Sequence, residues 1–336
     1  MRLLRKILYP FSLLYSGITH LRNRMYDLGF LESRSFGLPV ICVGNLSVGG
    51  TGKSPMIEYL ISLLKEEFAV ATLSRGYKGE SKGFYLLKGT EEAKAVGDEP
   101  LQFKSKFPEI TVAVDEKRRR GIEMLLNSEN RPEVILLDDA FQHRQVEAGL
   151  NILLTSYGKL YSEDHVLPTG DLREGRGGAG RAQLVVVTKC PMDLSPSEKE
   201  TIRKKLSLNG DQQLFFSGIS YGSRVMSAAS QLELRDLGKF QLVTGIANPR
   251  PLTDHLASQN LEFDHLSFPD HHNFKETEIE ALRKHSFVLT TEKDYMRLKG
   301  HLAPENLYYL PMEMTFLSRE EQQRFDLLVK QYCRRS

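Results

Sequence analysis

The stretch "ICVGNLSVGGTGKSP", residues 41–55, decides the fold class of this chain. Its end matches the phosphate-binding loop pattern G-x-x-x-x-G-K-[ST], except that Ser47 stands where the pattern has its first glycine. The apolar run before Gly44 predicts a buried strand, and a helix is expected to begin at Lys53, so the loop amides between them can point at phosphate oxygens. We therefore predict a nucleotide site here, with a plain glycine-rich turn as the alternative.

The residues that would contact a nucleotide are those that match the pattern. Gly52 permits close backbone approach, Lys53 places a cation on the β- and γ-phosphates, and Ser54 offers its hydroxyl to Mg²⁺. The first glycine serves loop geometry, so Ser47 is tolerable, whereas a plain turn gives no reason for Lys-Ser after the last glycine. The predicted nucleotide-binding residues are Ser47, Val48, Gly49, Gly50, Thr51, Gly52, Lys53 and Ser54.

Short apolar runs and helical stretches alternate from residue 38 onward. Runs such as "PVICVG", "FAVATLS", "EVILLDD" and "LVVVTK" are mostly apolar and do not alternate with polar residues, which is typical of parallel strands covered on both faces. The prediction is an α/β fold: a P-loop NTPase-like, mostly parallel sheet with helices on both faces, then a second, smaller α/β domain. The predicted segments are an N-terminal helical segment (1–36), a P-loop core domain (37–234), a smaller α/β domain (235–312) and a C-terminal segment that packs back on the core (313–336).

Composition and charge narrow the class of protein. The 336 residues are 40% hydrophobic and 26% charged with a net charge of +2, which is typical of a folded globular chain without general attraction to nucleic acid. The three cysteines have no C-x-x-C spacing, which argues against a zinc ribbon or a disulfide framework and favours a reducing compartment. We predict no nucleic-acid partner and no obligate protein partner.

The N-terminal segment differs from the rest in charge. Five basic residues and no acidic residue precede Asp27, and they surround an apolar series, which favours an amphipathic helix lying on a membrane surface. A helix packed in the core is the main alternative. A secretory signal is disfavoured because Tyr9-Pro10 breaks the apolar run and no clear cleavage site follows.

Two acidic pairs stand where a strand ends or a helix begins. In "VILLDDAFQHR", residues 134–144, Asp138 and Asp139 follow four apolar residues and match the Walker B arrangement, in which a carboxylate holds Mg²⁺ or its water. In "GDEP", Asp98 and Glu99 precede an expected helix. Capping of the next helix is the alternative for both pairs.

The motif "FPDHHNF", residues 268–274, brings Asp270, His271 and His272 together in the predicted second domain. Adjacent histidines in a loop are usually solvated, and no third ligand at suitable spacing indicates zinc. The function of this motif depends on what it faces across the molecule.

Taken in order, these motifs resemble the tetraacyldisaccharide 4'-kinase family of lipid A biosynthesis. The matching stretches are "NLSVGGTGKSP", "LSRGYKG", "GDEP", "DDAFQHR", "LPTGDLRE", "VTKCP", "FPDHHNF" and "TEKD", between about residue 38 and residue 294. The resemblance implies a P-loop kinase, peripheral on the cytoplasmic face of the inner membrane of a Gram-negative bacterium. It implies transfer of the γ-phosphate of ATP, with Mg²⁺, to the 4'-hydroxyl of a tetraacylated glucosamine disaccharide 1-phosphate, in a cleft between two α/β domains.

The resemblance also implies roles for single residues. Asp98 would take the proton from the sugar hydroxyl, and His271 would orient Asp98 from the opposite domain. The implied catalytic residues are Asp98, His271, Lys53 and Arg173, the last offsetting charge on the transferred phosphoryl group. The implied metal and phosphate environment is Ser54, Glu99, Asp138, Asp139 and Glu174.

Two other functions remain open at this point. A P-loop GTPase or metallochaperone would share the phosphate-binding loop, although "TEKD" and "TKCP" do not match a guanine-reading N-K-x-D element. A non-catalytic, membrane-associated ATP sensor would bind nucleotide without turnover. The kinase interpretation accounts best for the cationic, apolar N-terminus, because acyl chains resist leaving a bilayer by about 0.8 kcal/mol per CH₂ and the enzyme must come to such a substrate.

Overall fold

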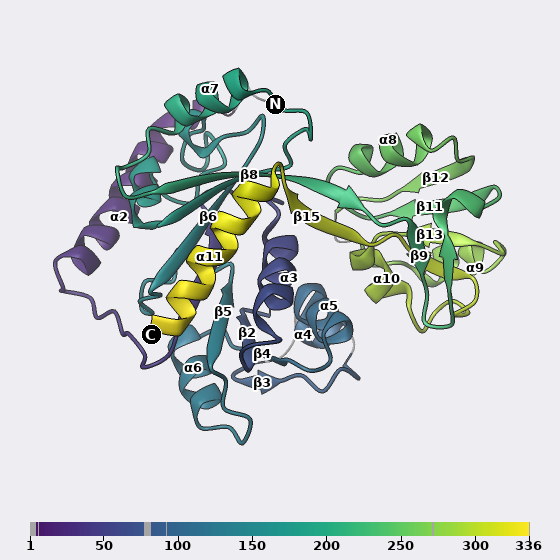
Figure 1. The fold of residues 1–336 in the computed structure, drawn as a ribbon, viewed down its shortest axis with the longest axis horizontal. Helices are drawn as coiled ribbons and strands as arrows, with labels where there is room; N and C mark the ends of the chain where they lie inside the picture. Colours follow the sequence, from purple (N-terminus) through teal and green to yellow (C-terminus); the bar gives the residue numbers. More distant parts are fainter. Residues whose placement is uncertain (1–4, 6, 77–81, 92, 271, 336) are drawn as a thin grey trace.

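The computed structural model describes residue 5 and residues 7–76, 82–91, 93–270 and 272–335, which form two sheets flanked by helices (Figure 1). The strands of the first sheet are β1 (Val40–Asn45), β2 (Val70–Ser74), β3 (Tyr85–Leu86), β4 (Thr111–Val114), β5 (Val134–Asp138), β6 (Leu150–Ser156), β7 (Leu184–Thr188), β8 (Gln213–Tyr221) and β15 (Met312–Phe316). Those of the second sheet are β9 (Arg224–Met226), β10 (Gln231–Glu233), β11 (Phe240–Thr244), β12 (Phe263–Ser267), β13 (Val288–Thr290) and β14 (Leu307–Tyr309). The α-helices in the described residues are α2 (Tyr9–Asp27), α3 (Lys53–Leu64), α4 (Ala93–Val96), α5 (Asp98–Lys106), α6 (Arg118–Leu126), α7 (Pro196–Leu206), α8 (Arg250–Ser258), α9 (Glu276–Leu282), α10 (Glu292–Leu298) and α11 (Arg319–Arg335).

Strand β1 lies inside the first sheet, whose order is β15-β8-β7-β6-β1-β5-β2-β4-β3. It pairs in parallel with both β6 and β5, and all six of its residues are buried. Ile41 and Val43 belong to an apolar cluster on one face of the sheet, and Cys42 belongs to the cluster on the other face. Burial on both faces explains why this run is apolar throughout. The predicted α/β fold is confirmed.

The register of β1 and β5 positions the candidate site. Val43 of β1 is the partner of Asp138 at the end of β5. Because the carboxyl ends of parallel strands meet at one edge of a sheet, the loop that follows β1 and the acidic pair at the end of β5 lie side by side.

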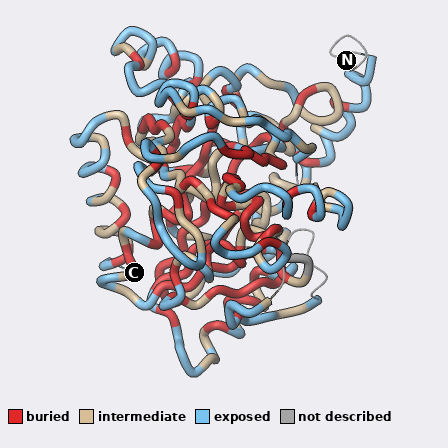
Figure 2. The backbone as a smooth tube through the Cα atoms, turned by 90° about the vertical axis from the view of Figure 1, so that its right-hand side faces the viewer, coloured by how far each residue is buried: buried red, intermediate tan, exposed pale blue. Residues whose placement is uncertain are grey.

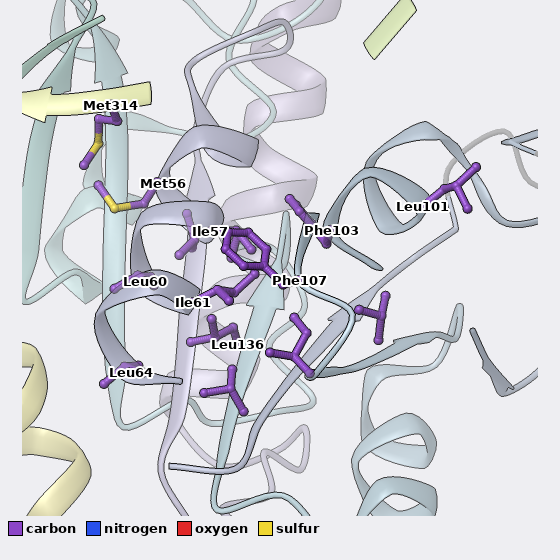
Figure 3. Packing of buried hydrophobic residues seen from close by; sticks show 14 of the residues in the cluster. Met56, Ile57, Leu60, Ile61, Leu64, Leu101, Phe103, Phe107, Leu136 and Met314 are labelled. Atoms are coloured by element: carbon purple, nitrogen blue, oxygen red, sulfur yellow. The ribbon is translucent and has the colours of Figure 1, made fainter. Parts of the chain in front are cut away.

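Helix α3 is fixed on the sheet by one apolar face. Figure 3 shows this face packed among Phe103, Phe107, Leu136 and Met314. Burying one such side chain stabilises the fold by about 1.5–3 kcal/mol, so the helix that follows the loop has little freedom to move. The buried residues of α3 in this cluster are Met56, Ile57, Leu60, Ile61 and Leu64.

The second sheet has the order β10-β9-β14-β13-β11-β12, and Figure 1 shows it with α8, α9 and α10 at one side of the molecule. The chain enters it after β8 and leaves it before β15, which returns to pair antiparallel with β8. Strands β9 and β10 join the second sheet although both precede residue 235. The predicted domain limits stay a prediction.

The two terminal helices lie in different parts of the molecule (Figure 1). Helix α11 buries Phe325, Val329 and Cys333 in the cluster that also holds α3. The predicted N-terminal helix is present as α2 and lies on the outside of the fold. Figure 2 shows the buried residues gathered in the interior of the molecule and the exposed ones along its surface.

Candidate active site

The loop between β1 and α3 presents backbone donors at the edge of the sheet. Gly49 has φ of 105° and Gly52 has φ of 86°, a left-handed conformation that favours glycine. Gly52 is the residue before the first turn of α3, so the N-terminus of the helix faces the loop. Within the described part of the chain, no acceptor takes a hydrogen bond from the N–H groups of residues 49–52. N–H groups at a helix N-terminus are a common way in which proteins bind phosphate.

Three polar side chains fix the conformation of the loop through hydrogen bonds. Asn45 Nδ2 donates to Thr51 Oγ1 at 2.7 Å, and Thr188 Oγ1 donates to the carbonyl oxygen of Thr51 at 2.8 Å. Lys189 Nζ donates to the carbonyl oxygen of Gly50 at 2.6 Å. Because these contacts engage Thr51 Oγ1 and two carbonyl oxygens, they leave the backbone N–H groups of the loop for a ligand.

The structure explains why Ser47 can replace the first glycine. Ser47 is buried and forms an antiparallel bridge with Leu172. On either side of it, Val48 N donates to Asp171 O at 2.8 Å and Arg173 N donates to Leu46 O at 2.7 Å. Ser47 and Val48 thus attach the loop to the "LPTGDLRE" segment. Of the residues predicted to contact nucleotide, this leaves residues 49–54 as the ones that we expect to contact phosphate.

The acidic pair after β5 meets the start of α3. Asp138 is buried, and Ser74 Oγ donates to its Oδ2 at 3.3 Å. Asp139 lies 3.7 Å from Lys53 Nζ and accepts a hydrogen bond of 2.8 Å from Arg173 Nη1. Four of the residues predicted for the site are therefore brought together at this edge: Lys53, Asp138, Asp139 and Arg173.

The two aspartates differ in their pKa. Burial raises the pKa of Asp138 to about 7, and the negative charges of Glu99 and Asp139 add to this effect. Burial alone would also raise the pKa of Asp139, but Lys53 and the hydrogen bond from Arg173 lower it below its ordinary value. Asp139 is therefore ionised at neutral pH, whereas Asp138 needs a cation nearby to be fully ionised.

The donor set fits a divalent cation that is bound together with phosphate. Asp138 Oδ1 is buried and has no hydrogen-bond partner among the described residues, and Ser54 Oγ donates to Glu99 Oε1 at 3.4 Å in the same region. The described residues contain no cluster of three or more His, Cys, Asp or Glu side chains that could hold a metal by themselves. Mg²⁺ usually binds through one or two carboxylates plus the phosphates of a substrate. A site with Asp138 and without a complete cluster of protein ligands among the described residues is therefore what such an ion needs.

Glu174 is placed differently from the other predicted metal residues. It is fully buried, and its carboxylate accepts hydrogen bonds from Arg181 at 2.8 and 3.0 Å, from Gln142 Nε2 at 3.0 Å and from Asn23 Nδ2 at 2.6 Å. Both of its oxygens are therefore engaged within the protein. Glu174 thus links helix α2 to the glycine-rich segment of residues 176–181. We leave it out of the metal-binding residues proposed below.

The "GDEP" acids lie at the junction of the two sheets. Gly97, not Asp98, is the N-cap of α5, and no side chain caps the helix, so the capping alternative is wrong for this pair. Asp98 accepts hydrogen bonds from Arg297 Nε, at 3.2 Å, and from Arg297 Nη2. Glu99 accepts one from Lys293 Nζ at 3.1 Å. Both cations belong to α10, the helix that follows β13 of the second sheet.

The "FPDHHNF" motif is only partly covered, because His271 lies outside the described residues. His272 Nε2 is 2.8 Å from Glu278 Oε2, and its ring stacks on Phe268 with centroids 4.7 Å apart. His272 is thus engaged by its own segment. The negative charge of Asp270 is one of the causes that raise the pKa of Arg297, which puts this motif close to α10.

Comparison with known proteins covers the whole chain. The family model of LpxK, tetraacyldisaccharide-1-P 4'-kinase, matches residues 4–332. The chain belongs to this family. The tetraacyldisaccharide 4'-kinase of Flavobacterium johnsoniae is 50% identical to it in an alignment that covers 99% of this chain and 98% of that protein.

More distant members of the LpxK family agree. The tetraacyldisaccharide 4'-kinase of Bacteroides thetaiotaomicron is 45% identical over 98% of this chain and 94% of its own length. A crystal structure of LpxK from Aquifex aeolicus, described as an "apo" form in complex with ATP, has a TM-score of 0.80 and 31% identity and covers 98% of this chain and 99% of that one. The resemblance inferred from the motifs is confirmed.

Sequence reasoning missed several residues at this LpxK-family site. Thr188 and Lys189 hold the phosphate-binding loop, and Lys293 and Arg297 hold the "GDEP" acids. Thr188, Lys189 and Lys293 lie in "VTKCP" and "TEKD", which are among the matching motifs, and Arg297 lies just after "TEKD". The motifs alone do not show which carbonyl oxygen or carboxylate each side chain contacts.

Proposed function

We infer that this chain is an ATP-dependent kinase that transfers the γ-phosphate of ATP to the 4'-hydroxyl of a tetraacylated glucosamine disaccharide 1-phosphate in lipid A biosynthesis. One observation carries the inference. A loop whose N–H groups at residues 49–52 have no acceptor among the described residues lies beside Lys53 and Asp139, in a chain that matches the 4'-kinase family from residue 4 to residue 332.

Phosphoryl transfer asks the protein mainly for positioning and charge neutralisation. A bond forms between the 4'-oxygen of the sugar and the γ-phosphorus, the bond from that phosphorus to the oxygen shared with the β-phosphate breaks, and ADP leaves. Lys53 and the loop amides would hold the β- and γ-phosphates. Arg173, which now pairs with Asp139, would offset charge on the transferred group.

Asp98 is the residue that we assign to accept the proton of the 4'-hydroxyl as the new bond forms. It stands at the start of α5, and its neighbour Glu99 lies 3.4 Å from Ser54. Asp98 thus directly precedes a residue whose carboxylate contacts Ser54, the residue after Lys53. The assignment of His271 as the partner of Asp98 stays a prediction.

Mg²⁺ bound with ATP would neutralise charge on the β- and γ-phosphates. Ser54 and Asp138 are the residues that would hold it, because one is the hydroxyl at the end of the loop and the other has a buried oxygen without a partner among the described residues. Asp139 and Glu99 would add negative charge to the same site.

The direct test uses γ-labelled ATP and the disaccharide 1-phosphate lipid in detergent micelles, followed by chromatography of the lipid. We expect one labelled lipid product, formed about 10²- to 10⁴-fold more slowly by Asp98→Asn while ATP binding remains. Equal or better labelling from GTP would favour the GTPase alternative. Nucleotide binding with no labelled lipid would favour the sensor alternative and overturn the kinase proposal.

Helix α2 has its polar side turned inward. Its buried residues are Ser12 and Thr19, and Ser12 Oγ donates to Thr169 Oγ1 at 2.7 Å. Tyr15 OH donates to Arg173 O at 3.0 Å from the same helix. The exposed large apolar residues in and beside α2 are Ile7, Leu8, Tyr9, Phe11, Leu13, Leu14, Tyr15, Ile18, Leu21, Met25, Leu28 and Phe30. A core-packing helix would show the reverse arrangement.

We propose that this apolar face lies on the cytoplasmic surface of the inner membrane, which holds the lipid substrate. A continuous exposed apolar face with basic flanks is typical of an interfacial helix. Among the described residues, no helix is long and apolar enough to cross a bilayer.

Flotation with anionic liposomes tests this membrane contact. Leu14→Glu/Ile18→Glu should lower the bound fraction about tenfold or more, because two apolar side chains of about 1.5–3 kcal/mol each are replaced by anions. Leu327→Glu on α11 is the matched control, since Leu327 is 55% exposed on another helix. Unchanged flotation of the double variant would show that the face does not bind membranes. Deleting residues 1–26 is a poorer test, because it also removes the contacts of α2 with residues 169–174.

A further inference from the structure

Helices α5 and α10 face each other with complementary charges. Asp98 pairs with Arg297, Glu99 pairs with Lys293, and Lys106 pairs with Glu292 at 3.3 Å. The first residue of α5 meets the end of α10, and the last residue of α5 meets its start, so the helices run in opposite directions. The first sheet and the second sheet are thus joined by ion pairs directly beside the candidate base.

Arg297 is the most enclosed of the three cations. Only 8% of its side chain is exposed, compared with 23% for Lys293 and 26% for Lys106. Its Nε and Nη2 both donate to Asp98, so the pairing is bidentate. A bidentate guanidinium fixes the plane of a carboxylate, which an ammonium cannot do.

The other side of Arg297 is anchored in the second sheet. Its Nη1 donates to Asp294 Oδ1 at 3.0 Å, and Asp294 is fully buried. Asp294 Oδ2 in turn accepts hydrogen bonds of 2.8 Å from Gly245 N and from Thr291 Oγ1. A Cβ at Gly245 would lie 2.9 Å from Asp294 Oδ1, so the loop after β11 approaches this carboxylate closely. The orientation of Arg297 is therefore set by β11 and α10 together.

We propose that Arg297 is a positioning residue for the phosphoryl transfer: its guanidinium holds the Asp98 carboxylate in the orientation that accepts the proton of the sugar hydroxyl. The inference rests on the proposed kinase function and on Asp98 as the base. It makes the docking of the second sheet a condition for a correctly oriented base. An exposed ion pair contributes little to either stability or orientation, but this one is enclosed on both sides.

The test compares kcat and KM for ATP in Arg297→Met, Arg297→Lys, Asp98→Asn and the double variant Asp98→Asn/Arg297→Met. Arg297→Met should lower kcat by about 10- to 100-fold, the usual cost of a misplaced catalytic group, with KM for ATP changed no more than about twofold. Arg297→Lys should recover part of the loss. In the Asp98→Asn background, Arg297→Met should cost no more than about twofold, because residues that act as a unit are not additive.

The control is Arg283→Met, which removes a half-exposed arginine that pairs with Glu276 in the second sheet's own helices. It should leave kcat unchanged. A purely structural role for Arg297 would instead lower kcat by the same factor with and without Asp98, and would lower the melting temperature and ATP binding too. If wild type labels the lipid, Asp98→Asn labels it far more slowly, and Arg297→Met behaves as wild type, this inference alone is overturned. If wild type makes no labelled lipid, the proposed function fails first.

Discussion

The candidate site has two sides that are held in different ways. We call them the loop wall, which is the loop between β1 and α3, and the Asp98 wall, which is the start of α5. The phosphate-binding loop is attached to a single sheet, with α3 fixed by a continuous apolar face (Figure 3) and the loop tied down by Thr188 and Lys189. The Asp98 wall is held by ion pairs from α10, which belongs to the second sheet. We infer that the first wall binds nucleotide regardless of the second sheet, whereas the second wall is complete only when the sheets are docked.

The largest effect is expected on the loop wall. Lys53→Ala should lower lipid phosphorylation by about 10³-fold, because the ammonium bridges phosphates as charge moves between them. The fold should remain, since Lys53 Nζ is not part of the apolar face of α3. Activity assays and thermal melts of the same preparation check both parts. Near-normal turnover in a folded Lys53→Ala variant would contradict the assignment of this loop to phosphate binding.

The next effect compares the stability of the two walls. Leu60→Ala, on the fully buried face of α3, should lower the free energy of unfolding by about 2–5 kcal/mol through lost burial and a cavity. Lys293→Met at the junction should lower it by about 1 kcal/mol or less, because that ion pair is partly exposed. Urea unfolding of both variants measures the difference. Equal losses would show that the ion pairs carry as much stability as the apolar packing.

The loop wall could be predicted from the sequence, whereas the contacts of the Asp98 wall could not. The loop, its strand and its helix are specified within residues 41–64, where apolar spacing and the G-K-S motif agree. The pairing of Asp98 with Arg297 joins residues 199 positions apart, and no local pattern states which charges will meet. Glu174 is a second case: the family resemblance implied a metal role, and the sequence alone could not show that Asn23 of helix α2 would donate to its carboxylate.

The smallest expected effect is a change in the pH dependence of stability at Glu292, the residue of α10 that pairs with Lys106. Burial, together with the negative charge of Glu58, raises the pKa of Glu292 from 4.5 to about 7. The folded chain therefore keeps a proton that the unfolded chain releases between these values, so the stabilising contribution of this group is present at low pH and is lost as the pH rises through 7. Glu292→Gln, which lacks the charge, should be closer to wild type in stability at pH 5 than at pH 8, where it should be more stable by about 1 kcal/mol or more.

Thermal or urea unfolding of the Glu292→Gln variant at both pH values decides the matter. Gln102 Nε2, which donates to both Glu58 and Glu292, can still donate to the amide oxygen of the substituted side chain. A variant that is destabilised equally at pH 5 and pH 8 would show that Glu292 is ionised throughout and is needed by Lys106.

The central claim is that the two walls separate nucleotide binding from transfer. Calorimetric titration with Mg²⁺ and ATP, run side by side on Lys53→Ala and Arg297→Met, tests it most directly. We predict that Lys53→Ala weakens ATP binding about tenfold or more, because it removes a cation from the phosphates, while Arg297→Met changes the Kd no more than about twofold. Equal weakening of ATP binding in the two variants would contradict the account.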